Sequence, residues 1–230
     1  LCTDKPEFGN TIVIDQNEDH PEIGESHSTA RAGSLPPDPA HAIPENLIGW
    51  RNSLRKEFIN QRLALPANER LDNTQKIIQG LDSSMGKVRD TIVSLYWHFK
   101  GETNLLDWMK SLILRGARVA LPVVVEKHQP LVFRTWAPGE KLEGGIWNIP
   151  VPVDGKPVTP AIVIAPRVGF DIQLYRLGYG GGYFDRTLQN FSTKPLVIGV
   201  GYELTRLPTI FPQSYDVPMD LIVTDHQIHQ

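Results

Sequence analysis

Apolar residues recur at helical spacing over three stretches of the chain. The first stretch ends at Pro66, which predicts a helix over residues 47–65. A second helix is predicted over residues 67–81, and a third over 104–116 with Gly116 just past its end. The apolar positions of the first helix are Leu47, Trp50, Leu54, Phe58 and Leu63, and those of the third are Leu105, Trp108, Met109, Leu112 and Ile113.

Short apolar runs alternate with these helices and predict buried strands at residues 91–97, 118–125, 161–166, 196–202 and 219–225. Another helix is predicted over residues 183–191. Residues 131–160 alternate only weakly and are rich in proline and glycine, which indicates a β-hairpin excursion. The predicted fold class is α/β: a single domain with an open, mainly parallel sheet, helices on both faces (three-layer α/β/α) and this hairpin. Ligands in such sheets bind beyond the carboxyl ends of the strands.

Composition separates residues 1–44 from the rest. This stretch is polar and rich in proline and acidic residues, so we expect a poorly structured N-terminal tail, followed by a folded domain over 45–230. The formal charge of -3 argues against a broad nucleic-acid surface, and no apolar run approaches the roughly 20 residues that span a bilayer. The single cysteine, Cys2, rules out an internal disulfide framework and favours a reducing compartment. No signal peptide is visible after Leu1.

The stretch RVGFDIQLYRLGYGGGYFDRTL (167–188) contains the main candidate site. Consecutive glycines can adopt positive φ, and their N–H groups can converge on an anion at the start of a helix. Arg176 could add positive charge and Asp185 could hold a hard cation, a combination that suits nucleotide phosphates with Mg²⁺. The stretch matches neither a Walker loop, since Tyr183 and Phe184 follow the glycines, nor a Rossmann fingerprint. From the residues alone, a phosphate loop and a tight turn both remain open.

Charged residues elsewhere offer partners for such a site. Arg51 and Arg55 lie four positions apart on one helix face, where they repel each other unless an anion or a carboxylate lies between them. The alternative is a solvated basic face. Asp216 and Asp220 either shape a loop or supply a second carboxylate to the metal. No histidine pair has the spacing of a zinc site, and no serine has the setting of a nucleophile.

Three further residues could contact a flat ligand. Glu102 lies where a predicted strand meets a helix, and it either accepts hydrogen bonds from ligand N–H groups or stabilises the start of the helix. Trp97 could pack on a flat ring. Trp147 either stacks on a ligand or belongs to the core. The residues alone do not choose between these readings.

Five segments, in this order, resemble the 5-formyltetrahydrofolate cyclo-ligase family over residues 47–225: RNSLR, KGET, WNIPVP, PRVGFD and RLGYGGGYFDR. The last is the most specific. The resemblance implies an ATP-dependent ligase: Mg·ATP phosphorylates the formyl oxygen of 5-formyltetrahydrofolate, and N10 then attacks the activated carbon. The products would be 5,10-methenyltetrahydrofolate, ADP and phosphate. Such a reaction needs positioning and charge neutralisation rather than a covalent nucleophile.

The resemblance also assigns roles to individual residues. Catalysis would involve Arg176 and Tyr183. The ATP site would comprise Arg51, Arg55, Arg176, Leu177, Gly178, Tyr179, Gly180, Gly181, Gly182, Tyr183 and Phe184. The folate site would comprise Arg55, Trp97, Glu102, Trp147, Tyr179, Gly180, Gly181, Gly182 and Tyr183. Asp185 and Asp216 would bind Mg²⁺.

Four positions depart from the family pattern. Arg51 replaces the usual lysine, Leu105 a threonine, Leu174 a glycine and Phe184 a tyrosine. None of these changes removes a charge from the expected phosphate or metal site, so we expect the activity to be retained. The alternative is a nucleotide-binding relative with lost or altered folate chemistry that acts as a regulatory binding protein. We expect a monomer in the cytoplasm or an organellar matrix, without nucleic-acid or membrane partners.

Overall fold

The computed structural model describes residues 43–230. Its main sheet has eight strands in the order β13-β12-β10-β7-β1-β2-β3-β6. Strands β12, β10, β7, β1 and β2 are mutually parallel, whereas β13, β3 and β6 run antiparallel to their neighbours. The strands are β1 (Ile92–Ser94), β2 (Arg118–Val123), β3 (Val132–Trp136), β6 (Pro157–Val158), β7 (Ile162–Pro166), β10 (Leu196–Val200), β12 (Leu221–Val223) and β13 (Ile228–His229). The predicted open, mainly parallel sheet is confirmed.

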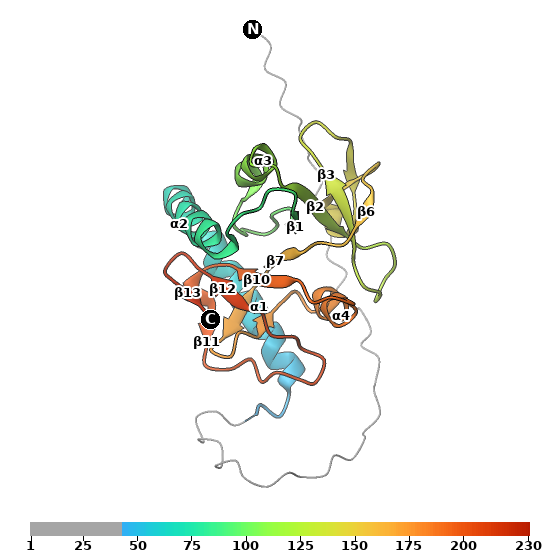
Figure 1. Cartoon of the computed structure of the whole chain (residues 1–230). Helices are drawn as coiled ribbons and strands as arrows, with labels where there is room; N and C mark the ends of the chain where they lie inside the picture. The colour runs from blue at the N-terminus through green and yellow to red at the C-terminus, as the bar shows by residue number, and fades with distance from the viewer. Residues whose placement is uncertain (1–42) are drawn as a thin grey trace. The chain divides into compact units, whose positions relative to one another are not determined.

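The described residues form four α-helices, and Figure 1 shows α2 and α3 on the opposite side of β7, β10 and β12 from α4. They are α1 (Leu47–Ala64), α2 (Ala67–Met85), α3 (Leu106–Leu114) and α4 (Tyr183–Gln189). Pro66 is the N-cap residue of α2, so it separates the first two helices as the sequence predicts. Each predicted helix is present, with bounds that differ by a few residues.

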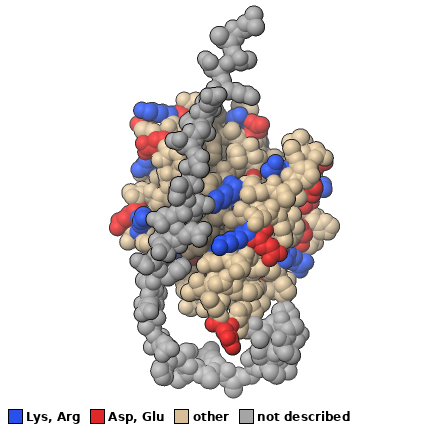
Figure 2. Space-filling view, turned by 180° about the vertical axis from the view of Figure 1, so that it is seen from behind, with Lys and Arg blue, Asp and Glu red and all other residues tan. Residues whose placement is uncertain are grey.

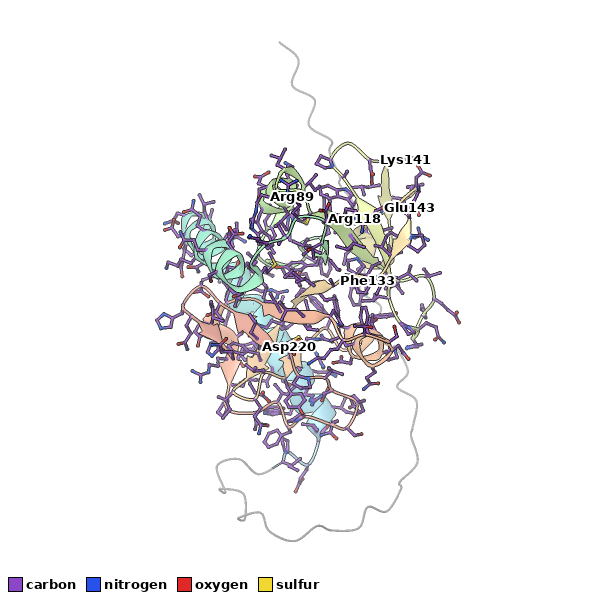
Figure 3. All side chains as sticks on the ribbon, viewed as in Figure 1. Arg89, Arg118, Phe133, Lys141, Glu143 and Asp220 are labelled. Carbon is purple, nitrogen blue, oxygen red and sulfur yellow. The ribbon has the colours of Figure 1, made fainter. Side chains whose placement is uncertain are left out.

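The alternation of side chains along the strands accounts for the layers. In β7, Ile162 and Ile164 pack with the buried faces of α2 and α3, while Val163 and Ala165 pack on the other side. That second layer includes Phe133, labelled in Figure 3, and Leu188 of α4. A strand buried on both faces reads as a continuous apolar run, which is why AIVIAP was recognisable in the sequence.

The sequence did not reveal a second, three-stranded sheet in the order β11-β8-β9. It comprises β8 (Gly169–Asp171), β9 (Arg176–Leu177) and β11 (Arg206–Leu207). Phe58 of α1 packs against it so closely that a Cβ on Gly169 would lie 2.8 Å from its ring. This contact holds α1 beside the segment that leads from β9 to α4.

The predicted hairpin excursion is confirmed by β4 (Leu142–Gly144) and β5 (Pro150–Pro152), which pair antiparallel. The strand predicted over residues 91–97 is shorter than expected, because only Ile92–Ser94 join the ladder. Strand β13 was missed. Its two residues are too few to produce a recognisable pattern.

The prediction of an N-terminal tail falls almost wholly on residues 1–42, which lie outside the described part of the chain. Within residues 43–230, no helix has both the length and the hydropathy needed to cross a bilayer. On the face shown in Figure 2, acidic and basic side chains are interspersed.

Candidate active site

The glycine loop, defined here as Gly178–Gly182, connects β9 to α4. Gly180 and Gly182 have φ of 103° and 62°, which are values that favour glycine. At Gly178 a Cβ would lie 2.6 Å from Nη1 of Arg176, so a larger residue there would displace the end of that side chain. The glycines therefore both permit the turn and allow arginine side chains to approach the backbone.

Arg55 lies against this loop from α1. Its Nε donates a 2.7 Å hydrogen bond to the carbonyl of Gly178, and its Nη1 donates to Asn52 Oδ1 at 2.7 Å. Burial, followed by the charge of Arg51, lowers the pKa of Arg55 to about 10. The solvated basic face that the sequence left open does not describe this pair, since Arg51 is buried and Arg55 is half-buried.

Two ion pairs join the other charged candidates. Nη2 of Arg51 lies 2.7 Å from Oδ2 of Asp216, and Nη2 of Arg176 lies 2.7 Å from Oδ2 of Asp185. Arg51 also donates to two backbone carbonyls in the loop before Asp216. The second oxygen of Asp185 accepts from the backbone N–H of Val217 at 3.3 Å. Asp185 thus bonds to the residue that follows Asp216 in the chain.

Asp220, labelled in Figure 3, has a different role from Asp216. It accepts hydrogen bonds from Lys194 at 2.5 Å and from the backbone N–H of Val197 at 2.8 Å, so it fixes the approach to β12. Across residues 43–230, no three His, Cys, Asp or Glu side chains gather as a metal-binding group. A metal held only by protein side chains is not supported in this part of the chain.

The aromatic cluster, defined here as Phe99, Trp147 and Tyr179, includes one residue of the glycine loop, Tyr179. The rings of Phe99 and Trp147 are nearly parallel, with centroids 6.1 Å apart and an interplanar angle of 7°. Tyr179 is inclined to both, at 5.8 and 5.7 Å. Trp147 is 48% exposed and has φ of 55°, rare for a bulky residue, so the reading that placed it in the core is wrong.

Glu102 is buried behind this cluster. Its Oε1 accepts from the hydroxyl of Tyr179 at 2.8 Å, and its Oε2 accepts from the backbone N–H of Phe99 at 2.9 Å. Burial raises the pKa of Glu102 to about 7, against the opposing effects of Arg62 and these hydrogen bonds. Burial also raises the pKa of Tyr179. At the start of α3 the N–H of Leu106 donates to Oδ1 of Asn104 at 3.0 Å, and the N-cap residue is Leu105.

The remaining predicted aromatic residues lie apart from this cluster or at its edge. Trp97 packs edge-on against Trp136, with centroids 6.1 Å apart, on the layer beneath α3. Tyr183 begins α4, and the guanidinium of Arg186 lies 5.3 Å from its ring centroid. The structure therefore joins Tyr179, Glu102 and Trp147 directly, whereas Trp97 contacts a neighbouring part of the core.

Sequence reasoning missed three site residues: Phe99, Arg62 and Arg186. Arg186 folds back from α4 and donates to the carbonyl of Gly181. Arg62 lies seven positions after Arg55, a spacing that returns to the same face of a helix, but from the sequence it belonged less clearly to the face of Arg51 and Arg55. Phe99 had no comparable signal, because only the fold brings it next to Trp147.

The departures from the family pattern have physical explanations. The ring of Phe184 packs into the core layer beside α4 and lies 5.2 Å from the guanidinium of Arg176, where no hydroxyl is needed. Leu105 is 1% exposed and fills the core before α3. Leu174 has φ of 68°, a strained value that its burial and two backbone hydrogen bonds maintain.

Comparison with known proteins now decides the family. The sequence profile of the 5-formyltetrahydrofolate cyclo-ligase family matches residues 48–225. The chain belongs to this family. It is 30% identical to the 5-formyltetrahydrofolate cyclo-ligase of Haemophilus influenzae over 183 residues, covering 75% of this chain and 97% of that protein.

Solved structures agree with this cyclo-ligase assignment. The 5,10-methenyltetrahydrofolate synthetase of Aquifex aeolicus superposes with a TM-score of 0.67 at 29% identity, covering 78% of this chain and 92% of that one. The synthetase of Mycoplasma pneumoniae superposes with a TM-score of 0.64 at 25% identity, covering 76% and 99%. The α/β fold predicted from the sequence is therefore that of methenyltetrahydrofolate synthetases.

Proposed function

We propose that this cyclo-ligase family member converts 5-formyltetrahydrofolate and ATP into 5,10-methenyltetrahydrofolate, ADP and phosphate. One observation carries the proposal beyond family membership: Tyr179 belongs to the glycine loop, yet its side chain contacts Glu102 and the aromatic cluster. A single residue thus joins a basic, glycine-lined site to a site suited to a flat ring. The reaction needs these two sites side by side.

The arginines and the glycine loop would bind the triphosphate. Arg55 and Arg176 flank the loop, and Gly180 leaves the backbone open beside the guanidinium of Arg55, 3.6 Å from the position of a Cβ. Guanidinium groups form strong, charge-assisted hydrogen bonds with phosphate oxygens. Arg51 would join them from α1, with Leu177, Tyr183 and Phe184 completing the pocket.

The folate ring would stack on the aromatic cluster and donate its N–H groups to Glu102. Trp147 supports this assignment, because it exposes half of a large ring stacked on Phe99. Stacked aromatic contacts of this kind contribute about 0.5–1.5 kcal/mol beyond the buried area. Trp97 and the glycine loop would form the remaining walls.

Asp185 and Asp216 would bind Mg²⁺ together with ATP. Mg²⁺ takes oxygen ligands and is usually held by one or two carboxylates plus substrate phosphates and waters. Asp185, bonded to the residue after Asp216, and Asp216 itself would fit that mode, since the described residues hold no group of three acidic, His or Cys ligands. The ion would neutralise charge on the transferring phosphate.

The chemistry then needs no covalent enzyme intermediate. The formyl oxygen takes the γ-phosphoryl group, N10 attacks the formyl carbon and loses its proton, and the carbon–oxygen bond breaks as phosphate departs. Arg176 would stabilise charge on the phosphoryl group, and Tyr183 would help to orient the reacting atoms. We further propose that the enzyme acts as a monomer in the cytoplasm or an organellar matrix, without nucleic-acid or membrane partners.

The test is to incubate the full chain with 5-formyltetrahydrofolate and Mg·ATP and to follow the absorbance of methenyltetrahydrofolate together with ADP release. We expect equal amounts of the two products. ADP release without methenyltetrahydrofolate, or no turnover despite ATP binding, would refute the ligase assignment.

A further inference from the structure

Arg62 is a buried arginine of α1 to which neither the sequence nor the family resemblance gave a role. It is 2% exposed. Its Nε donates to the carbonyl of Lys100 at 2.6 Å, and its Nη1 donates to the carbonyl of Arg167 at 3.2 Å. Its Nη2 donates to the carbonyl of Phe99 at 3.4 Å and to the hydroxyl of Tyr179. One side chain therefore connects α1 to three segments that are distant in sequence.

Two of the residues that bond to Arg62, Tyr179 and Phe99, also bond to Glu102. The hydroxyl of Tyr179 accepts from Arg62 and donates to one oxygen of Glu102. Phe99 accepts from Arg62 through its carbonyl and donates its N–H to the other oxygen. Both carboxylate oxygens are thus fixed through residues that Arg62 anchors.

We propose that Arg62 is a positioning residue for the folate end of the site, which acts through Tyr179 and Phe99 to hold the Glu102 carboxylate ionised and aimed at the ligand. This inference rests on the proposed function, since it requires that Glu102 accepts hydrogen bonds from the folate ring. Arg62 itself would not touch the ligand.

Other charged and titratable groups around Glu102 do not duplicate this role. Tyr96 is buried, and its ionised form would repel the ionised carboxylate of Glu102. Arg167 and Tyr202 line a cavity of about 10 Å³ with Arg62 and Glu102, enough for about one water. Arg167, however, donates to Thr205 and lies 3.7 Å from the ring centroid of Phe170. Among its neighbours, Arg62 contributes most to lowering the pKa of Glu102.

The sign of the expected pH dependence follows from this arrangement. Glu102 offers both carboxylate oxygens as acceptors to ligand N–H groups only when it is ionised, so folate affinity should fall as the pH falls through its pKa. Loss of the Arg62 charge raises that pKa, so the fall should begin at a higher pH. A nearby opposite charge typically changes a carboxyl pKa by about 1–3 units.

The experiment is calorimetric titration of 5-formyltetrahydrofolate into the full chain between pH 6 and 9 without ATP, so that no turnover occurs. For Arg62→Gln we expect the pH midpoint of binding to rise by about one unit or more. We expect affinity at pH 7 to fall by up to about tenfold. Arg62→Lys keeps the charge but loses the planar fork, so its midpoint should stay near that of the wild type while affinity falls.

The matched control is Arg115→Gln, which removes the same charge from an ion pair with Asp82 at 2.5 Å, outside the site. Its midpoint should equal that of the wild type. If Arg62→Gln does not fold, Tyr179→Phe replaces it, because this change removes the hydroxyl that links Arg62 to Glu102 and should raise the midpoint too.

The possible results separate this inference from the proposed function. If the wild type does not bind 5-formyltetrahydrofolate at any pH, the proposed function fails. If it binds but Arg62→Gln, or Tyr179→Phe in its place, leaves the midpoint unchanged, the positioning role of Arg62 is overturned. Wild-type binding that is independent of pH would also overturn it.

Discussion

Asp185 and Asp216 would have different partners in the ligand-free and the Mg·ATP-bound states of the proposed site. In the structure each carboxylate is neutralised by an arginine at 2.7 Å. Binding of Mg·ATP would allow each carboxylate to exchange arginine for metal, and would free guanidinium groups to meet phosphate. A buried charge left without a partner costs several kcal/mol, so the ion pairs keep the ligand-free site stable.

Asp185→Asn tests the metal assignment. The single amide oxygen can still accept from Arg176, but the amide nitrogen cannot accept from the N–H of Val217, and the negative charge is lost. We expect the Mg²⁺-dependent gain in ATP affinity to fall by at least about 10- to 100-fold, since loss of even an outer-shell partner of a metal has that effect. Calorimetric titration of ATP with and without Mg²⁺ measures it.

The control for this variant is Asp220→Asn, in which the same substitution is made at a carboxylate that binds Lys194 and Val197. Its Mg²⁺ response should match the wild type. An Asp185→Asn protein that retains the full Mg²⁺ response would contradict the assignment of Asp185 as a ligand.

At the scale of elements, the glycine loop depends on backbone conformation as well as on side chains. Gly180 has φ of 103°, which an alanine adopts only with strain. A Cβ at Gly180 would make only ordinary contact with Arg55, at 3.6 Å. A substitution at Gly180 should therefore affect ATP binding by changing the backbone path of the glycine loop.

Gly180→Ala should weaken ATP binding by about tenfold or more, because backbone strain of about 1–3 kcal/mol displaces the loop from its path. The matched control is Gly139→Ala: Gly139 has φ of 89°, open space around its Cβ position, and lies in a turn away from the loop. Both variants should unfold at lower urea concentration. Equal ATP affinity in the two would show that the loop conformation does not matter for binding.

The sequence predicted the elements that follow simple periodic patterns. Helices α1 and α2 and the buried strand β7 could be found because their apolar spacing is regular. The small sheet β11-β8-β9 could not, since two- or three-residue strands leave no period and depend on Phe58 packing against them from α1. Likewise, the glycine loop was visible as a motif, whereas its contact with Phe99 and Trp147 exists only in three dimensions.

At the scale of the whole molecule, the buried Glu102 of the proposed folate site lowers the free energy of unfolding at neutral pH. Glu102 lies at the meeting point of α1, the glycine loop and the segment after β1, where burial raises its pKa from 4.5 to about 7. Because the folded state holds the proton more tightly than the unfolded state, stability falls as the pH rises from about 4.5 to about 7. The ionised carboxylate needed for binding is therefore destabilising at neutral and higher pH, by up to about 3 kcal/mol.

Glu102→Gln should remove this dependence, because a neutral amide of the same size can still bond to the N–H of Phe99 and to the hydroxyl of Tyr179. At pH 8 we expect the variant to be more stable than the wild type by about 1–3 kcal/mol in urea unfolding, and at pH 5 to be nearly equal to it. Its affinity for 5-formyltetrahydrofolate should fall at pH 8 and change little at pH 5, where Glu102 of the wild type is already protonated. Glu143→Gln, at an exposed position labelled in Figure 3, provides the control and should differ from the wild type equally at both pH values. If Glu102→Gln were less stable than the wild type at pH 8, the carboxylate would be a stabilising part of the core, and the conflict between stability and binding inferred here would not exist.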